Sequence, residues 1–196
     1  LEKHPPHYYG ANPWISPDGS FMLYSCDSGP DRNDIARVDL ATPDAEPEIV
    51  YATPHRELGA KVSPDGRYMV YISDSSGRYE IYLARYPSGE GRRQVSVDGG
   101  LWPRWRGDGH EILFVASDSL MAVDVDLEGR PLIGTPRGLF SVGPTTHSLA
   151  TGYLKDFDMT PDAERFLITR EVRTADEVVE DTRIVHVEHW YEEFRR

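Results

Sequence analysis

The sequence lacks the features that mark several large classes of protein. Its single cysteine, Cys26, excludes an internal disulfide framework, and its place at the end of an apolar segment predicts a packed rather than a reactive thiol. No apolar run approaches the roughly 20 residues of a membrane-spanning helix, and no signal peptide is recognisable. The chain begins at Leu1 rather than at methionine, so we expect a piece of a longer protein. We predict no membrane contact from this segment.

Basic residues are few compared with acidic ones. The chain has 21 Lys and Arg against 33 Asp and Glu, which gives a net charge of −12 at pH 7. A nucleic-acid-binding domain presents a basic face, and here only Arg92-Arg93 and Arg104 with Arg106 come close to a basic cluster. The composition therefore argues against a nucleic-acid partner.

Catalytic motifs are also missing. The sequence contains no Gly-x-Ser-x-Gly nucleophile elbow, no His-Glu-x-x-His, no phosphate-binding loop and no Gly-x-Gly-x-x-Gly. His186 and Glu188 would share one face of a strand while His189 points away, which disfavours a metal site there. The segment Asp27–Asp34 carries oxygen ligands suited to calcium but lacks the spacing of a calcium loop. We interpret it as a solvated loop, with calcium as the alternative, and predict a non-enzyme without cofactor or metal.

The stretch Ser63–Ser73 combines a tight turn with a strand. Pro64 presets φ for the second turn position, Gly66 accepts a left-handed conformation, and Asp65 can accept hydrogen bonds from backbone N–H groups. In the strand that follows, both alternating sets of side chains are apolar: Tyr68, Val70 and Ile72 on one face, Met69 and Tyr71 on the other. The pattern predicts a strand that is covered on both faces.

The same turn-and-strand unit occurs four times. Its turn residues are Asp18 and Gly19, Asp65 and Gly66, Asp108 and Gly109, and Asp162 with Ala163, so that the aspartates stand 47, 43 and 54 residues apart. Because these aspartates recur once in each unit, we interpret them as structural rather than catalytic. In the third copy Gly107 replaces the proline, and in the fourth Ala163 replaces the glycine, so we expect altered turn geometry in both. Strand-rich repeats of about 40–45 residues are typical of propeller blades.

We therefore predict an all-β protein, a β-propeller of about four four-stranded blades. The expected organisation is an N-terminal arm (1–11), blade 1 (12–51), blade 2 (52–96), blade 3 (97–141), blade 4 without its outer strand (142–188) and a C-terminal tail (189–196). The expected strands are 12–16, 21–26, 35–40 and 48–51 in blade 1; 58–62, 68–73, 79–85 and 93–96 in blade 2; 101–105, 110–116, 120–126 and 138–141 in blade 3; and 154–159, 165–170 and 183–188 in blade 4.

These units resemble the WD40-like (PD40) repeat of TolB-type bacterial β-propellers, which has the pattern W-S-P-D-G, an apolar strand, a polar turn and then D/E-I-Y. The matching segments are Trp14–Gly19 with Asp34-Ile35, Lys61–Gly66 with Glu80-Ile81-Tyr82, Trp105–Gly109 with Ser119-Leu120-Met121, and Met159–Ala163 with Arg183-Ile184-Val185. The resemblance covers about residues 12–188 and implies the propeller fold. A TolB-like role would imply contact with an envelope partner and a periplasmic or other extracytoplasmic location.

The segment Ile184–Phe194 is similar to the end of the propeller regions of bacterial receptor-like serine/threonine kinases and winged-helix regulators. This similarity implies the C-terminal part of a sensor. Since family propellers often carry six or more blades, the alternatives are a closed four-bladed ring, an open fragment, or two chains that pair their end blades. An unclosed array exposes apolar blade faces, so we favour a fragment that self-associates or packs on further blades.

Candidate binding residues lie opposite the Ser-Pro-Asp-Gly turns, where propellers usually bind ligands. The candidate set is His55, Arg56, Glu57, Trp102, His147, Tyr153 and Lys155. Aromatic and charged groups around a channel suit a peptide or a glycan, although Trp14, Trp102 and Trp105 also fit packing between blades. We predict a module that binds a protein or peptide for sensing or scaffolding. The alternatives are a glycan-binding or lyase-like propeller and the gating propeller of a peptidase.

Overall fold

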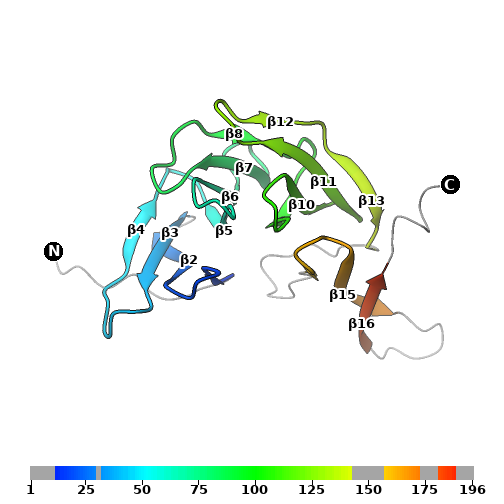
Figure 1. Cartoon of the computed structure of the whole chain (residues 1–196), viewed down its shortest axis with the longest axis horizontal. Helices are drawn as coiled ribbons and strands as arrows, with labels where there is room; N and C mark the ends of the chain where they lie inside the picture. The colour runs from blue at the N-terminus through cyan, green and yellow to red at the C-terminus, as the bar shows by residue number, and fades with distance from the viewer. Residues whose placement is uncertain (1–11, 30–31, 143–156, 173–180, 189–196) are drawn as a thin grey trace. The chain divides into compact units, whose positions relative to one another are not determined.

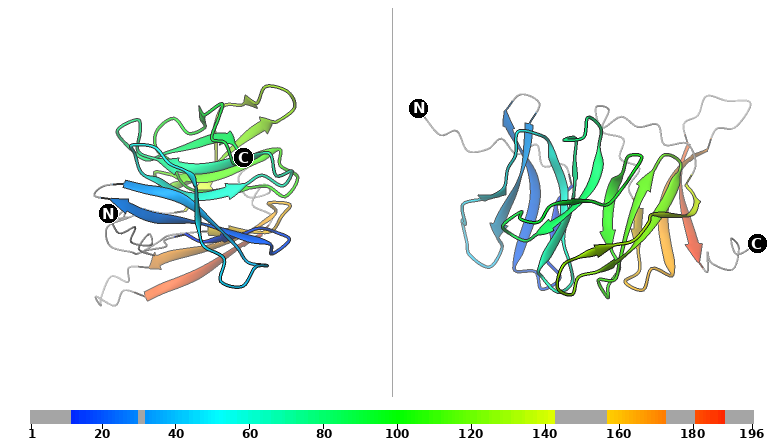
Figure 2. Two further views of the ribbon diagram at one scale, coloured as in Figure 1. Left: turned by 90° about the vertical axis from the view of Figure 1, so that its left-hand side faces the viewer. Right: turned by 90° about the horizontal axis from the view of Figure 1, so that it is seen from above.

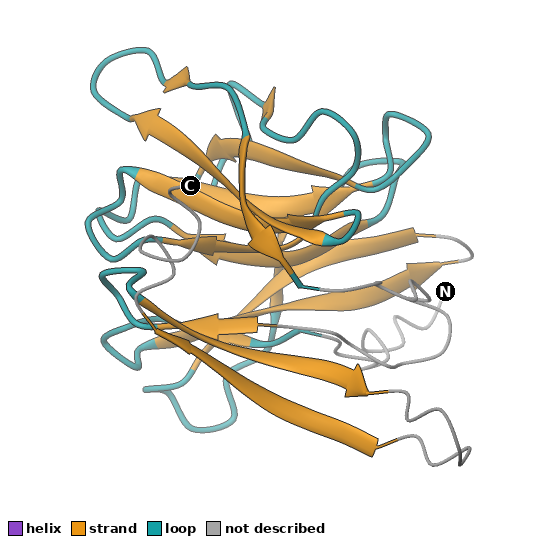
Figure 3. Ribbon diagram, turned by 90° about the vertical axis from the view of Figure 1, so that its right-hand side faces the viewer, coloured by secondary structure: helices purple, strands orange, loops and turns teal. Residues whose placement is uncertain are grey.

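The computed structural model describes residues 12–29, 32–142, 157–172 and 181–188, and its strands are shown in Figure 1. The chain divides into two compact units, Leu1–Trp105 and Arg106–Arg196. Every regular element in the described ranges is a β-strand, and Figure 3 accordingly shows strands and loops alone. The all-β prediction is confirmed. Among these residues no helix has the length and apolarity of a membrane span.

The first unit contains two four-stranded antiparallel sheets. Blade 1 has the order β1 (Trp14–Ile15), β2 (Phe21–Gly29), β3 (Arg32–Asp39), β4 (Glu48–Tyr51); blade 2 has the order β5 (Glu57–Val62), β6 (Tyr68–Ser73), β7 (Glu80–Arg85), β8 (Arg93–Gln94). The strand β9 (Leu101–Trp105) ends this unit and lies against β5, β6 and β7. In Figure 2 the long strands of blade 1, in blue, lie beside those of blade 2, in cyan and green.

The second unit contains the remaining strands. In one sheet β11 (Ser119–Asp126) pairs with β10 (Glu111–Ala116), β12 (Leu132–Ile133) and β13 (Arg137–Ser141). In the other, β14 (Phe157–Met159), β15 (Arg165–Val172) and β16 (Asp181–Glu188) follow in order. Among the described strands this last sheet has three members. The short strand β12 lies where the sequence predicts only a connection.

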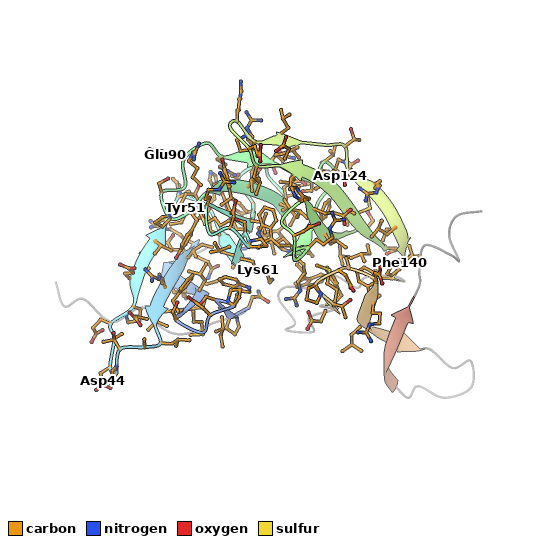
Figure 4. The ribbon with its side chains drawn as sticks, in the orientation of Figure 1. Asp44, Tyr51, Lys61, Glu90, Asp124 and Phe140 are labelled. Atoms are coloured by element: carbon orange, nitrogen blue, oxygen red, sulfur yellow. The ribbon has the colours of Figure 1, made fainter. Side chains whose placement is uncertain are left out.

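The core of the first unit forms between the two sheets. As predicted, β6 is covered on both faces: all of its residues are buried, with Met69, Val70 and Tyr71 at 0% exposure. Leu23 and Ile35 of blade 1 pack with Ala60, Met69, Tyr71 and Tyr82 of blade 2 in one cluster. Tyr51, labelled in Figure 4, packs against this cluster, and the Tyr71 hydroxyl donates to the Tyr51 hydroxyl at 3.0 Å. The face of β6 that carries Met69 and Tyr71 therefore joins the two sheets of this unit.

One sequence prediction about blade 1 is wrong. The polar stretch Asp27–Asp34 was expected to be a loop, but β2 continues to Gly29 and β3 begins at Arg32. Cross-strand pairing runs as far as Asp27 with Asn33 and Gly29 with Arg32. Asp34 is buried at 2% exposure inside this ladder, where the Arg32 side chain satisfies it. Local polarity misled the prediction because an ion pair allows a charged residue to occupy a buried strand position.

Candidate functional site

In each blade, the end that carries the Ser-Pro-Asp-Gly turn or its variant is here called the turn end. The four turns share one hydrogen-bond pattern. In all four copies the aspartate carboxylate accepts the backbone N–H two residues later, at 3.0–3.1 Å. The N–H of the fourth turn residue donates to the carbonyl of the first at 2.8–2.9 Å. The fourth residue has φ between 58° and 75° in every copy. The four turns are thus one structure, in which each aspartate accepts a hydrogen bond across its turn.

The two divergent copies keep this geometry, so the expected alteration is wrong. Ala163 adopts φ 58° in the glycine position, which an L-residue reaches at a cost of about 1–2 kcal/mol. In the third copy Arg106 stands where the other copies have serine or threonine, and its guanidinium donates to Asp108 at 2.9 and 2.8 Å. The aspartate and the backbone bonds are enough to set the turn, and the other positions can change.

The environment of these aspartates favours their ionised form. Hydrogen bonds from Ser16 and then Ser20 lower the pKa of Asp18 to about 2. The hydrogen bond from Arg106 lowers the pKa of Asp108 to about 2. The pKa of Asp65 is also lowered, because bonds from Ser63 and Arg67 outweigh partial burial. A carboxylate held in this way is a permanent acceptor and a poor proton donor or base near neutral pH.

The opposite end, here called the loop end, differs from blade to blade. In blade 2 it is formed by the β4–β5 connection and the β6–β7 loop. The Arg56 N–H donates to the Asp74 carboxylate at 2.9 Å, and its guanidinium donates to the Tyr79 hydroxyl at 3.2 Å. The half-exposed His55 imidazole lies 3.9 Å from the same carboxylate. The structure therefore brings the predicted residues His55 and Arg56 together on Asp74; the predicted residues His147, Tyr153 and Lys155 lie outside the described residues.

Glu57, the first residue of β5, has a different environment. Its side chain is fully buried (0% exposed). Oε1 accepts hydrogen bonds from Thr53 at 2.7 Å and Ser73 at 3.1 Å, while Oε2 has no partner among the described residues. Burial raises the pKa of Glu57, against the effect of these hydrogen bonds. A carboxyl oxygen buried without a partner is costly, and functional sites often contain such groups.

Trp102 on β9 is the second unusual residue of the loop end. It is buried (5% exposed), its indole Nε1–H has no partner among the described residues, and its φ is 54°. Asn12 and Gly59 occupy the equivalent position relative to the turn aspartate in blades 1 and 2, with φ of 70° and 61°. The left-handed residue is therefore part of the repeat, but a tryptophan in this conformation is strained.

Glu57 and Trp102 lie at the same end of neighbouring strands. Trp105, at the end of β9, donates its indole N–H to the carbonyl of Lys61 near the end of β5, at 3.0 Å. The strands β5 and β9 are in contact and end together, so they also begin at the same end of the unit. The buried atoms without a hydrogen-bond partner among the described residues at this end include the acceptor Glu57 Oε2 and the donor Trp102 Nε1, together with Arg92 Nε near Ser75. The sequence identified Glu57 and Trp102 as candidates and also indicated packing between blades for Trp102, but it gave no indication that Glu57 is buried or that either residue has an unpaired polar atom.

The other buried carboxylates are paired with arginine. Asp34 accepts from Arg32 at 3.2 and 2.9 Å, and Glu80 accepts from Arg78 at 2.7 Å. Glu111 accepts from Arg106 at 3.2 Å and also from Arg137. The first two pairs share the pattern Arg-x-acidic-Ile, which the sequence analysis missed and which would have predicted them. Asp34 is thus structural, and among the described residues no three His, Cys, Asp or Glu side chains are grouped to hold a metal ion.

Comparison with known proteins identifies the fold. No family model and no curated protein sequence matches this chain. Among solved structures, TolB from Acinetobacter baumannii matches 92% of the chain with a TM-score of 0.63 and 18% identity. The propeller domain of the trilobed protease from Pyrococcus furiosus (92%, TM-score 0.50, 12% identity) and an oligogalacturonate lyase in complex with manganese (92%, TM-score 0.57, 16% identity) also match.

These similarities show that the chain has a β-propeller fold. The chain spans 41% of the TolB structure, 54% of the trilobed-protease propeller and 48% of the lyase. The neighbours include enzymes as well as TolB, so the fold alone leaves function open.

Proposed function

We propose that this chain is a non-catalytic β-propeller module that binds a protein or peptide, as a sensing or scaffolding part of a bacterial signalling or envelope protein. The observation that supports the proposal is the pair of unpaired buried groups at the loop end, Glu57 Oε2 and Trp102 Nε1. A peptide offers both hydrogen-bond donors and acceptors, and partner groups of this kind would satisfy both. The resemblance to TolB-type repeats supports an extracytoplasmic location.

A binding experiment with two tryptophan variants tests this proposal. Peptides would be selected from a random display library on the purified chain, and the affinity of the best peptide measured by calorimetry. Trp102→Phe removes an N–H that no described residue accepts, so we expect weaker peptide binding at nearly unchanged stability. Trp105→Phe is the matched control: it removes the bond to Lys61, so we expect lower stability with little direct effect on affinity. Equal affinities for wild type and Trp102→Phe would contradict the proposal.

A carbohydrate lyase is the main alternative, since the same fold occurs in an oligogalacturonate lyase. In that case the purified chain would cleave oligosaccharides, and His147→Ala or Tyr153→Ala would abolish cleavage. We expect no turnover with a panel of oligosaccharides. A peptidase-gating role would require a hydrolase domain in the same gene product, which sequencing of the full gene would reveal.

Self-association through an end blade forms part of the proposal. In blade 1, Leu23 and Ile35 pack toward blade 2, whereas Tyr24, Cys26 and Ala36 form a separate cluster with Met22 and Val38. Neighbouring residues of a strand face opposite sides, so this cluster belongs to the sheet face turned away from blade 2. Tyr24, Cys26 and Ala36 are already buried within the chain, so contact with a blade of a second copy would involve the part-exposed Met22 and Val38. Sedimentation of wild type and Met22→Asp tests this: we expect a dimer that the charged variant dissociates.

A further inference from the structure

The buried carboxylates of the described chain divide into three with a cationic partner and one without. Asp34, Glu80 and Glu111 each bind at least one guanidinium. Glu57 is as deeply buried as Glu80, both at 0% exposure, but forms no ion pair within the described residues. Buried charges in proteins are normally paired, because transfer of a lone carboxylate out of water is strongly unfavourable. Glu57 is therefore a buried carboxyl group for which the described residues provide no cationic partner.

Among the described residues, no arginine at this end forms an ion pair with Glu57. Arg32 binds Asp34 through two nitrogens, and Arg78 binds Glu80 and the Val97 carbonyl. The guanidinium of Arg92 stacks 3.8 Å above the Tyr82 ring and donates to Ser75, while its buried Nε–H has no hydrogen-bond partner in the described part of the chain. The positive charge of Arg92 favours ionisation of Glu57, while the charge of Asp34 opposes it. No hydrogen bond joins Arg92 to Glu57 within the described residues, so Oε2 remains available as an acceptor.

We propose that Glu57 binds a cationic nitrogen group of the ligand, a guanidinium or ammonium, and that this group completes the missing ion pair. The inference rests on the proposed function, since it names the chemistry that the bound peptide must carry. In the three internal pairs the same role is filled by arginine. The unpaired indole N–H of Trp102, at the same end of the adjacent strand, would bind a carbonyl of the same ligand, and its ring is suited to contact with a cation.

The experiment compares two peptides that differ only in charge. Acetyl-Gly-Gly-Arg-Gly-Gly-amide and its citrulline counterpart have almost the same shape, but citrulline is neutral. Binding to the whole chain would be followed by the NMR signals of the Trp102 indole N–H and of the Glu57 carboxyl carbon. We expect the arginine peptide to shift both signals at millimolar concentration and to bind about thirtyfold more tightly than the citrulline peptide. Glu57→Gln should remove this difference.

Controls separate the inference from the proposed function. Asp98→Asn removes an exposed carboxylate at the same end (87% exposed), and the preference for arginine should survive it. Equal binding of both peptides would overturn the cationic contact while leaving peptide binding in place. Failure of the arginine peptide, of agmatine and of the peptides selected from the library to bind would overturn both. Binding of agmatine as tight as that of the peptide would support the cationic contact and identify a free small cation as the ligand. A Glu57 carboxyl that stays protonated at neutral pH when the arginine peptide is added would also overturn the inference.

Discussion

At the turn end, four different sequences form one structure, whereas at the loop end one repeat position carries residues as different as Asn12, Gly59 and Trp102. Each turn aspartate accepts its backbone hydrogen bond from the residue two positions later, and these aspartates are held ionised. The loop end of blade 2 depends on contacts between distant segments and leaves Glu57 Oε2 and Trp102 Nε1 without partners among the described residues. The turn end therefore has the same geometry in every copy because its turn connects the strands of the blade, whereas the residues at the loop end can differ from blade to blade.

The largest expected effect lies at the loop end, in Glu80→Ala. Glu80 accepts hydrogen bonds from Arg78, the Gly99 N–H and Ser96, and thereby holds the β8–β9 connection on β7. Loss of this buried carboxylate should lower the free energy of unfolding by about 3 kcal/mol, measured by urea titration. The matched control is Glu57→Gln, which breaks no ion pair.

Glu57→Gln should leave the free energy of unfolding nearly unchanged or raise it slightly, in contrast to Glu80→Ala. Burial raises the pKa of Glu57, so the folded state holds the proton more tightly than the unfolded chain, and stability falls as the pH rises through the raised pKa. The glutamine variant lacks this dependence. We expect a small gain at neutral pH that disappears in acid; a loss as large as that of Glu80→Ala would show that Glu57 has a structural partner.

At the turn end, Gly66→Ala should lower stability by about 1–2 kcal/mol, because φ is 75° and an added Cβ meets no atom within 4 Å. The loss would thus report backbone strain alone. The control is Ala163→Gly in the fourth copy, where relief of the same strain is offset by loss of a buried methyl group. Thermal unfolding of both variants measures the difference, and an unchanged Gly66→Ala would show that the turn relaxes.

Asp65→Ala should cost about 1 kcal/mol, since the carboxylate accepts bonds from Ser63 at 2.5 Å and from the Arg67 N–H at 3.0 Å. Urea unfolding provides the measurement. The same substitution at the exposed Asp98 should have a smaller effect. Equal effects would mean that Asp65 does not close its turn.

The smallest effect is the pH dependence contributed by Asp108. Its pKa is about 2 in the folded chain, below the ordinary value near 4. The stabilisation is therefore present above pH ~4 and is lost as the pH falls toward 2. Asp108→Asn should flatten the acid limb of the stability profile, measured by urea unfolding across this pH range.

The sequence alone determined the blades and their turns. Proline, aspartate and glycine act through φ preferences and bonds across two or three residues, and alternating apolar residues require burial on both strand faces. For this reason β4, β6 and β9 were predicted with correct bounds, and the four turns were found. Tertiary structure decided which polar residues are buried and which are satisfied. Asp34 has its arginine two residues away in the sequence, so that pair was predictable, whereas the burial of Glu57 without an arginine on Oε2 follows from packing between segments.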